Sequence, residues 1–235
     1  MNETAFPILV IGGVLVVFGL VIAVIVLAFH FKKQRRQAIA TFALKNGLSY
    51  TQHDPYNLPG TYDFNLFSMG DGRGAENLMT GQWKDRRIIE ADYWYYTEST
   101  DSDGSSSRSY SRFQVALFPI GAYLPKVQVV GETFFTRIAD HIGLEDINFE
   151  SEEFNRIFNV KSTDREFAFK LIDARMMQWL LYLGKRFSLE TSGSDLLVYC
   201  GQSKPEEIPL LLDAADQTID RIPRLVWEDY QVKGA

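Results

Sequence analysis

The sequence predicts an α+β fold, with one N-terminal transmembrane helix followed by a mixed, mainly antiparallel sheet domain with packed helices. Three observations support this prediction. The N-terminal region is an uncharged apolar run, the middle of the chain alternates apolar and polar residues with a period of two, and helical patterns follow without regular alternation. Such an irregular succession is typical of α+β proteins and not of doubly wound sheets.

The apolar run extends from Ala5 to Phe31 without a formal charge, and His30 lies at its end. The 24 residues Phe6–Phe29 would form a helix of roughly 36 Å, which is enough to cross a hydrocarbon core of about 30 Å with some tilt. A cleaved signal peptide would need a basic start, a shorter apolar stretch and a small-residue cleavage site. Because the chain begins Met-Asn-Glu-Thr, we expect a retained anchor.

Four cations follow the apolar run directly: Lys32, Lys33, Arg35 and Arg36. Lys and Arg next to a span remain on the cytoplasmic side, so the N-terminus is expected outside and the domain in the cytoplasm of a cell (plasma) membrane. The same four side chains are predicted to contact lipid headgroups of the bilayer, each contributing on the order of 1 kcal/mol.

Small residues form one stripe along the predicted span: Gly12, Gly19 and Ala23. The Gly19-x-x-x-Ala23 pattern lets two helices approach closely. One hypothesis is that this stripe packs against a membrane protein partner or a second copy of the chain; the alternative is a chance pattern, because small residues at this spacing are common in spans.

Charge and cysteine content exclude several classes of protein. Residues 1–36 hold Glu3 and four cations, a charge of +3; because the whole chain carries −6, residues 37–235 carry about −9. An acidic domain is repelled by nucleic acid, so no nucleic-acid partner is expected. Cys200 is the only cysteine, which excludes an internal disulfide and a cysteine zinc site.

No cofactor, metal site or catalytic residue is predicted. The segment GDGRGAEN, residues 70–77, lacks the Gly-Lys-Ser/Thr of a phosphate loop and is interpreted as a turn. The acids between Glu145 and Glu153 do not have calcium-loop spacing and are interpreted as a solvated surface.

Four segments organise the chain: an anchor at 1–31, a basic juxtamembrane helix at 32–47, a connector at 48–63 and a soluble α+β domain at 64–235. Gly47 is a natural helix stop, and Pro55, Pro59 and Gly60 oppose regular structure in the connector.

The pattern predicts strands near 64–69 and 76–83 and a hairpin formed by RRIIEADYWYY and SRFQVALFPI. Ile89, Ala91, Tyr93 and Tyr95 share one face of the first hairpin strand. The Ser-rich stretch 97–111 is expected to be a long solvated loop.

Beyond Pro125 the sequence predicts a strand at KVQVV, a helix at 133–143 and a strand carrying Phe154, Phe158 and Val160. Thr163 and Glu166 form a capping box that begins a helix. A hairpin is expected around Ser192-Gly193, and a final helix starts near Pro205. Its buried stripe is predicted to be Ile208, Leu211, Leu212, Ala215, Ile219 and Ile222.

The aromatic run at 93–96 offers the most distinctive surface candidate. Alternation sends Trp94 and Tyr96 to the face opposite Tyr93 and Tyr95. One hypothesis makes Trp94 and Tyr96 a docking patch, because Trp and Tyr are enriched at contact sites. The other covers both side chains with a helix.

The segments LFSMGDGRGAENLMTGQW, IIEADYWYY and FNRIFNVKSTDREFAFKLIDARMMQWLL, spread over roughly 64–200, resemble an uncharacterised bacterial family of single-span membrane proteins with a cytoplasmic domain of unknown function. The resemblance depends on apolar and aromatic spacing, supports the topology and implies no activity.

The sequence thus favours a single-pass, membrane-anchored cytoplasmic module that acts as a non-catalytic scaffold or accessory subunit of a membrane complex. The alternative is a membrane-proximal domain that binds lipid or a small ligand in an apolar cavity. A hydrolase or transferase with residues scattered along the chain is a third hypothesis.

Overall fold

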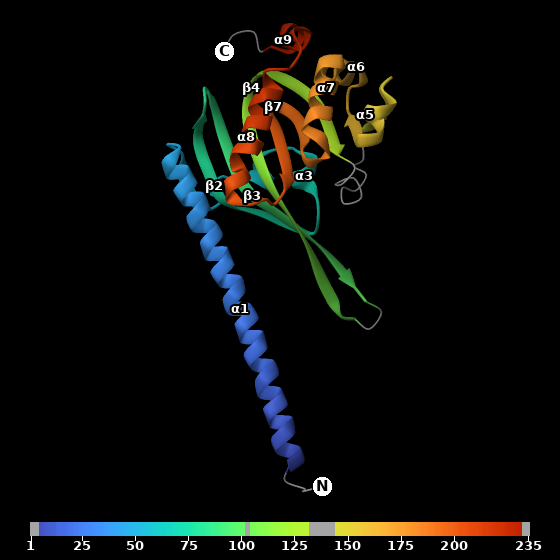
Figure 1. Ribbon diagram of the computed structural model, residues 1–235. Helices are drawn as coiled ribbons and strands as arrows, with labels where there is room; N and C mark the ends of the chain where they lie inside the picture. Colours follow the sequence, from blue (N-terminus) through green and yellow to red (C-terminus); the bar gives the residue numbers. More distant parts are fainter. Residues whose placement is uncertain (1–4, 102–103, 132–143, 232–235) are drawn as a thin grey trace.

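A computed structural model describes residues 5–101, 104–131 and 144–231, with side chains described from residue 13 onward. One long helix projects from a domain built around an antiparallel sheet, as Figure 1 shows. The predicted α+β class is confirmed. The helix predicted at 133–143 lies outside the described residues.

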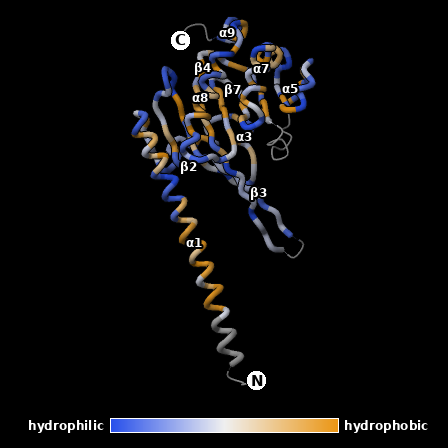
Figure 2. Tube along the Cα trace, viewed as in Figure 1, coloured by the Kyte–Doolittle hydropathy of each residue, from blue (hydrophilic) through white to orange (hydrophobic). Residues whose placement is uncertain are grey.

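Helix α1, Ala5–Lys45, is continuous over 41 residues. It is long and apolar enough to cross a membrane, and its apolar stretch is not buried by the rest of the chain. Figure 2 shows the change from apolar to polar residues where α1 reaches the domain. The last turns belong to the domain core, because Ile39 and Ala43 have no exposed surface. Gly47, with φ of 68°, ends the helix as predicted.

The described strands form one sheet in the order β1-β2-β3-β4-β6-β5, and every pairing is antiparallel. Strand β4 is the centre: β3 and β6 pair with successive parts of one edge, and β7 pairs along the other edge. The bounds are β1 Ser49–His53, β2 Gly72–Trp83, β3 Arg86–Thr100, β4 Ser106–Gly131, β5 Glu145–Ile147, β6 Phe158–Ser162 and β7 Ser188–Gly201.

The period-two alternation correctly predicted the faces of the β3–β4 hairpin. Tyr93 lies opposite Phe113 and Ala91 opposite Val115, and all four are buried. They belong to a core beneath the short helices α2, Leu58–Thr61, and α3, Asn65–Ser68.

A larger core occupies the opposite face of the sheet, where the end of α1 and the C-terminal helices pack. These elements are α5 Glu152–Ile157, α6 Arg165–Leu171, α7 Ala174–Leu183, η1 Gly184–Arg186, η2 Pro205–Glu207, α8 Ile208–Ile219 and α9 Arg224–Tyr230. The predicted stripe of the final helix is confirmed, because all six of its residues are buried. Since helices cover both faces, the central strands are buried on both sides.

Three predicted elements near the sheet differ from the structure. The segment 64–69 contains helix α3 and not a strand. The expected loop at 97–111 is mostly strand, because β3 continues to Thr100 and β4 begins at Ser106. The hairpin expected around Ser192-Gly193 is one strand, β7: Gly193 has φ of 59° at an irregularity opposite Leu124, so its turn signal produces a bulge.

The helix starts also differ in detail. Phe154 lies in α5, which begins after the cap Ser151, and not in a strand. Asp164 caps α6 instead of Thr163: its carboxylate accepts the backbone N–H of Phe167. Asp173 then caps a second helix, α7. An Asp side chain caps at least as well as Thr, so the capping position moves by one residue.

Candidate functional site at the junction of helix α1 and the sheet

Arg35 joins α1 to the sheet through three hydrogen bonds. Its Nε donates to Asp92 Oδ2 at 2.8 Å, its Nη2 donates to Asp92 Oδ1 at 2.6 Å, and its Nη1 donates to the Ser203 carbonyl at 2.6 Å. The two bonds to one carboxylate form the bidentate geometry that only guanidinium offers. We call Arg35, Asp92 and the Ser203 carbonyl the α1 clamp.

The acid of the clamp is held in position by the neighbouring strands. The Asp92 side chain is 2% exposed and also accepts a hydrogen bond from Asn77 Nδ2 at 2.9 Å. Asn77 has φ of 57° where the register of β2 shifts, and its Oδ1 accepts the Tyr50 hydroxyl at 2.9 Å. Strands β1, β2 and β3 therefore all fix the carboxylate that Arg35 meets.

A second acid lies beside the clamp on the same face of β3. Glu90 is fully buried, and Gln114 Nε2 donates to its Oε1 at 2.9 Å. Burial, and then the neighbouring Asp92, raise the pKa of Glu90 well above its ordinary value. Its other oxygen has no hydrogen-bond partner among the described residues. A neutral Glu90 avoids two adjacent buried anions and leaves Arg35 to pair with Asp92.

Surface ion pairs flank the clamp. Glu76 Oε2 lies 2.9 Å from Lys32 Nζ and 3.8 Å from Arg36 Nη2, and these side chains are partly exposed. Lys33 is exposed and has no ion pair among the described residues. Three of the four cations thus contact the domain, whereas headgroup contact stays a prediction for all four.

The predicted pair Trp94 and Tyr96 lies on the same face of β3 as Asp92, and both side chains are half-buried. Their rings stack at 6.3 Å with an interplanar angle of 13°. Across the hairpin, Tyr110 pairs with Tyr96 and Arg112 with Trp94. Within residues 5–101, 104–131 and 144–231 no helix buries the pair completely, and the docking hypothesis stays a prediction.

Glycines of β2 make room for these rings. A Cβ at Gly72 would lie 2.4 Å from the Tyr96 ring, and a Cβ at Gly74 would lie 2.9 Å from Trp94. Within the segment interpreted as a turn, Gly70 precedes the strand with a φ of 73°, whereas Gly72 and Gly74 lie in β2 and let aromatic side chains cover the backbone. The sequence signal for this packing is glycine at every second position of one strand, Gly72 and Gly74, next to aromatic residues at every second position of its neighbour, Trp94 and Tyr96.

The small-residue stripe of α1 is open. Nothing within the described chain lies within 4 Å of a Cβ built at Gly19, and Ala23 is exposed. Gly12 lies in α1 among the residues whose side chains are not described. Helix packing through this stripe stays a prediction.

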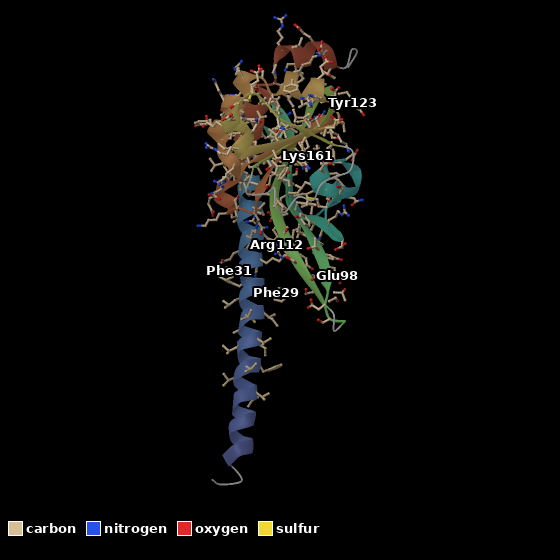
Figure 3. The ribbon with its side chains drawn as sticks, turned by 90° about the vertical axis from the view of Figure 1, so that its right-hand side faces the viewer. Phe29, Phe31, Glu98, Arg112, Tyr123 and Lys161 are labelled. Carbon is tan, nitrogen blue, oxygen red and sulfur yellow. The ribbon has the colours of Figure 1, made fainter. Side chains whose placement is uncertain are left out.

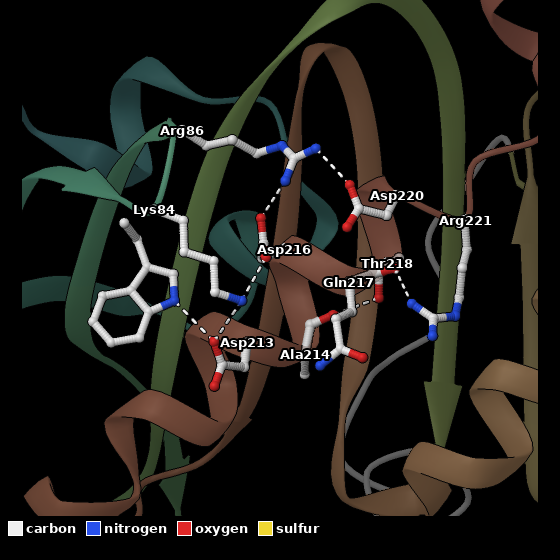
Figure 4. A network of polar contacts seen from close by, with 10 residues as sticks. Lys84, Arg86, Asp213, Ala214, Asp216, Gln217, Thr218, Asp220 and Arg221 are labelled. Carbon is white, nitrogen blue, oxygen red and sulfur yellow. Dashed lines mark hydrogen bonds and ion pairs between the residues drawn. The ribbon is translucent and has the colours of Figure 1, made fainter.

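The opposite end of the domain carries a charged network that the sequence did not indicate, drawn in Figure 4. Asp216 of α8 accepts hydrogen bonds from Lys84 of the β2–β3 turn and from Arg86, the first residue of β3, and Asp220 accepts from Arg86 Nη2 at 2.7 Å. Burial favours the neutral acid, but the two cations outweigh it and lower the pKa of Asp216. This network fixes α8 to the β2–β3 turn and the start of β3.

The only thiol and the acids are also candidates for chemistry. Burial raises the pKa of the Cys200 thiol to about 11, which keeps it protonated at neutral pH. No group of three His, Cys, Asp or Glu side chains within the described ranges has the arrangement of a metal site.

Buried Glu190 accepts hydrogen bonds from the amides of Asn65 and Leu66, at 2.6 and 3.1 Å, and from Gln128 Nε2 at 3.0 Å. Burial raises its pKa to about 7. Glu190 thus connects β7 to the start of α3. Its carboxylate oxygens accept from donors of the protein itself, which indicates a structural role.

Several hollows bear on ligand binding. A mostly enclosed apolar cavity bordered by Leu171, Met176 and Leu196 has a volume of about 10 Å³, which is room for roughly one water molecule. Three depressions are open to solvent: one of about 710 Å³ beside Arg86, Asp220 and Trp227, one of about 450 Å³ beside Arg73, and one of about 470 Å³ beside Tyr62. The enclosed cavity cannot hold an acyl chain.

The fold and the clamp together define a class of protein: an α+β domain fixed to the end of a long apolar helix. A solved structure with this fold is the crystal structure of the mycobacterial trehalose monomycolate transport factor A, TtfA, with a TM-score of 0.56 and 15% sequence identity over 80% of this chain and 92% of that chain. No protein-family model and no curated protein matches the chain. At this identity the likeness shows the fold. The bacterial neighbour agrees with the bacterial family that the sequence resembles.

Proposed function

We propose that this chain is a single-pass, membrane-anchored accessory module of a membrane transport complex, with a scaffolding and not a catalytic role. The observation that supports the proposal most is the continuity of α1: one helix contains the apolar segment and the buried residues Ile39 and Ala43. Because the clamp adds a bidentate ion pair, the domain and the anchor move as one body. Such a rigid connection suits a protein that holds other components at a fixed height above the bilayer.

The structural neighbour supports the transport context, because it is a transport factor. A shared fold does not transfer a cargo, so the proposal is limited to an accessory role in transport. The chain contributes the anchor and a docking surface, and partner proteins contribute the transport itself.

The proposed orientation places the N-terminus outside and the domain in the cytoplasm. Lys and Arg direct topology during insertion, before the domain folds and pairs them with its acids. Protease added to intact cells should leave residues 60–235 shielded, and digestion from outside would contradict this orientation.

Purification in mild detergent tests the accessory role. The wild-type chain should co-purify with a membrane protein in fixed stoichiometry, and repeated recovery of the chain alone would contradict the proposal. Asp92→Asn should remain in the membrane after carbonate extraction but retain less of the partner, because the apolar residues Ile39 and Ala43 then hold the domain against α1 without the ion pair. Glu76→Gln is the matched control, since it removes a partly exposed acid at the same junction.

A lipid- or small-ligand-binding role is the alternative function. Native mass spectrometry of the purified chain tests it by showing a bound small molecule. The enclosed cavity of about 10 Å³ favours the accessory role over an internal ligand site.

A further inference from the structure

We call residues 94–101 and 104–112 of the β3–β4 hairpin the arm. Its base, Trp94 to Tyr96, pairs with β2, and beyond Tyr96 the hairpin extends past the end of β2. In Figures 1 and 3 the arm points toward the N-terminal end of α1 and diverges from the helix. Figure 3 shows Glu98 on the arm at the level of Phe29 and Phe31 of α1. These two phenylalanines are 71% and 63% exposed and end the apolar segment, so the arm reaches the height of the expected membrane surface.

The two faces of the arm differ in chemistry. The cross-strand pairs Trp94–Arg112, Tyr96–Tyr110 and Glu98–Arg108 share one face, which we call the arm face. The other face carries the hydroxyl residues Thr97, Ser99, Ser107 and Ser109. Trp94 and Tyr96 cover the β2 backbone at Gly74 and Gly72, whereas the neighbouring Tyr110 is 47% exposed.

The arm face looks toward the side of α1. Trp94 and Tyr96 follow Asp92 at every second position, and Asp92 bonds Arg35 of α1. Arg108 lies over the Tyr96 ring at 4.7 Å, and Arg112 lies over the Tyr110 ring at 5.3 Å. The arginines are thus held over the rings, at the same face.

The charge of the arm face is opposite to that of the domain. Arg108, Arg112 and Glu98 sum to +1, whereas residues 37–235 sum to about −9. Arg112 is exposed and forms no ion pair among the described residues. Tyr, Trp and Arg together are the residues that proteins place at the membrane–water interface.

The length of the anchor makes this contact geometrically accessible. The uncharged run Ala5–Phe31 would measure roughly 40 Å as a helix, longer than a hydrocarbon core of about 30 Å, and such helices tilt. A tilt of α1 toward the arm brings the arm face down onto the bilayer and keeps the hydroxyl face in water.

We propose that the arm face, formed by Trp94, Tyr96, Tyr110, Arg108 and Arg112, lies on the phospholipid headgroups of the bilayer that α1 crosses. The inference rests on the proposed membrane anchorage of α1. The anchor fixes the domain at the membrane, and the arm provides a second contact that sets its tilt and rotation.

Single cysteines labelled with NBD, an environment-sensitive fluorophore, test the arm in the full-length chain. The chain is reconstituted in vesicles of phosphatidylethanolamine and phosphatidylglycerol that contain a headgroup spin label. Ser106→Cys places the label on the arm face, and Ser107→Cys places it on the hydroxyl face next to it. Because the natural Cys200 is buried, the fluorophore should react with the introduced cysteine.

The headgroup spin label should reduce the fluorescence at position 106 more than at position 107. Arg112→Glu should remove this difference, and Arg87→Glu, the same charge change at the other end of β3, should leave it unchanged. Equal quenching at the two positions would overturn the inference. So would shielding of position 106 from a water-soluble quencher without headgroup quenching, because a protein partner would then cover the arm.

Carbonate extraction of the same vesicles separates the two proposals. If the chain is released, the membrane anchorage fails and the arm contact fails with it. If the chain remains and position 106 is not quenched, only the arm contact fails.

Discussion

Replacing Asp92 by asparagine removes the negative charge of the α1 clamp with little change of shape. The Arg35 side chain is 18% exposed and the Asp92 side chain 2%, so the remaining guanidinium would lack a counterion in a mostly buried place. Breaking a buried ion pair from one side costs about 3–5 kcal/mol. That is a large part of the roughly 5–15 kcal/mol by which domains are stable.

The matched comparison is Glu76→Gln. Glu76 is 25% exposed and Lys32 49%, so this pair is screened by water and should contribute below about 1 kcal/mol. Both variants change one acid at the same junction, and they differ in burial.

Urea unfolding of the purified full-length chain in detergent, followed by circular dichroism, measures the two free energies. The double variant Arg35→Met with Asp92→Asn should recover part of the loss, because no unpaired charge remains and the introduced amide oxygen still accepts from Asn77. Equal losses for Asp92→Asn and Glu76→Gln would refute the reasoning, as would a double variant no more stable than Asp92→Asn.

Three further changes give defined outcomes. Burial raises the pKa of Glu190 from 4.5 to about 7, so between these pH values the folded chain keeps a proton that the unfolded chain loses. The free energy of unfolding should therefore fall by about 3 kcal/mol as pH rises through that interval. Glu190→Gln, unfolded at pH values between 5 and 8, should lack this fall, and the same pH dependence in wild type and variant would contradict the prediction. A Cβ at Gly131 would lie 2.5 Å from the Lys185 carbonyl oxygen, so Gly131→Ala should lower stability by roughly 1–3 kcal/mol. Gly121→Ala, with nothing within 4 Å, is its control, and similar melting temperatures would count against the clash. Gly19→Ile should disrupt self-association in detergent, and an unchanged oligomeric state would exclude a helix contact there.

The β3–β4 hairpin and the last helix could be predicted from the sequence because their signals are local. Ala91 and Tyr93 face the core at period two, and Ile208 and Leu211 do so at helical spacing. The clamp could not be predicted in the same way, since Arg35 and Ser203 are 168 positions apart. A cation next to a span is ordinarily interpreted as a lipid contact.

One signal for the clamp is nevertheless present in the sequence. Arg35, Ile39 and Ala43 recur at every fourth position, so Arg35 lies on the helix face that the two apolar residues bury. The bulge in β7 is harder to foresee. Ser192-Gly193 has the composition of a turn and therefore predicts a hairpin. Strand β4 is long enough to pair with the residues of β7 before and after Ser192-Gly193, and this pairing makes β7 one strand with a bulge.

The long separation within the clamp also orders events during synthesis. At about 5–20 residues per second, the 168 positions between Arg35 and Ser203 take roughly 8–34 s to translate. During that time the carbonyl that accepts from Arg35 does not exist. Under the proposed membrane anchorage, the guanidinium would first be available as a topogenic charge of the nascent chain, and it would later form the bond that completes the folded domain.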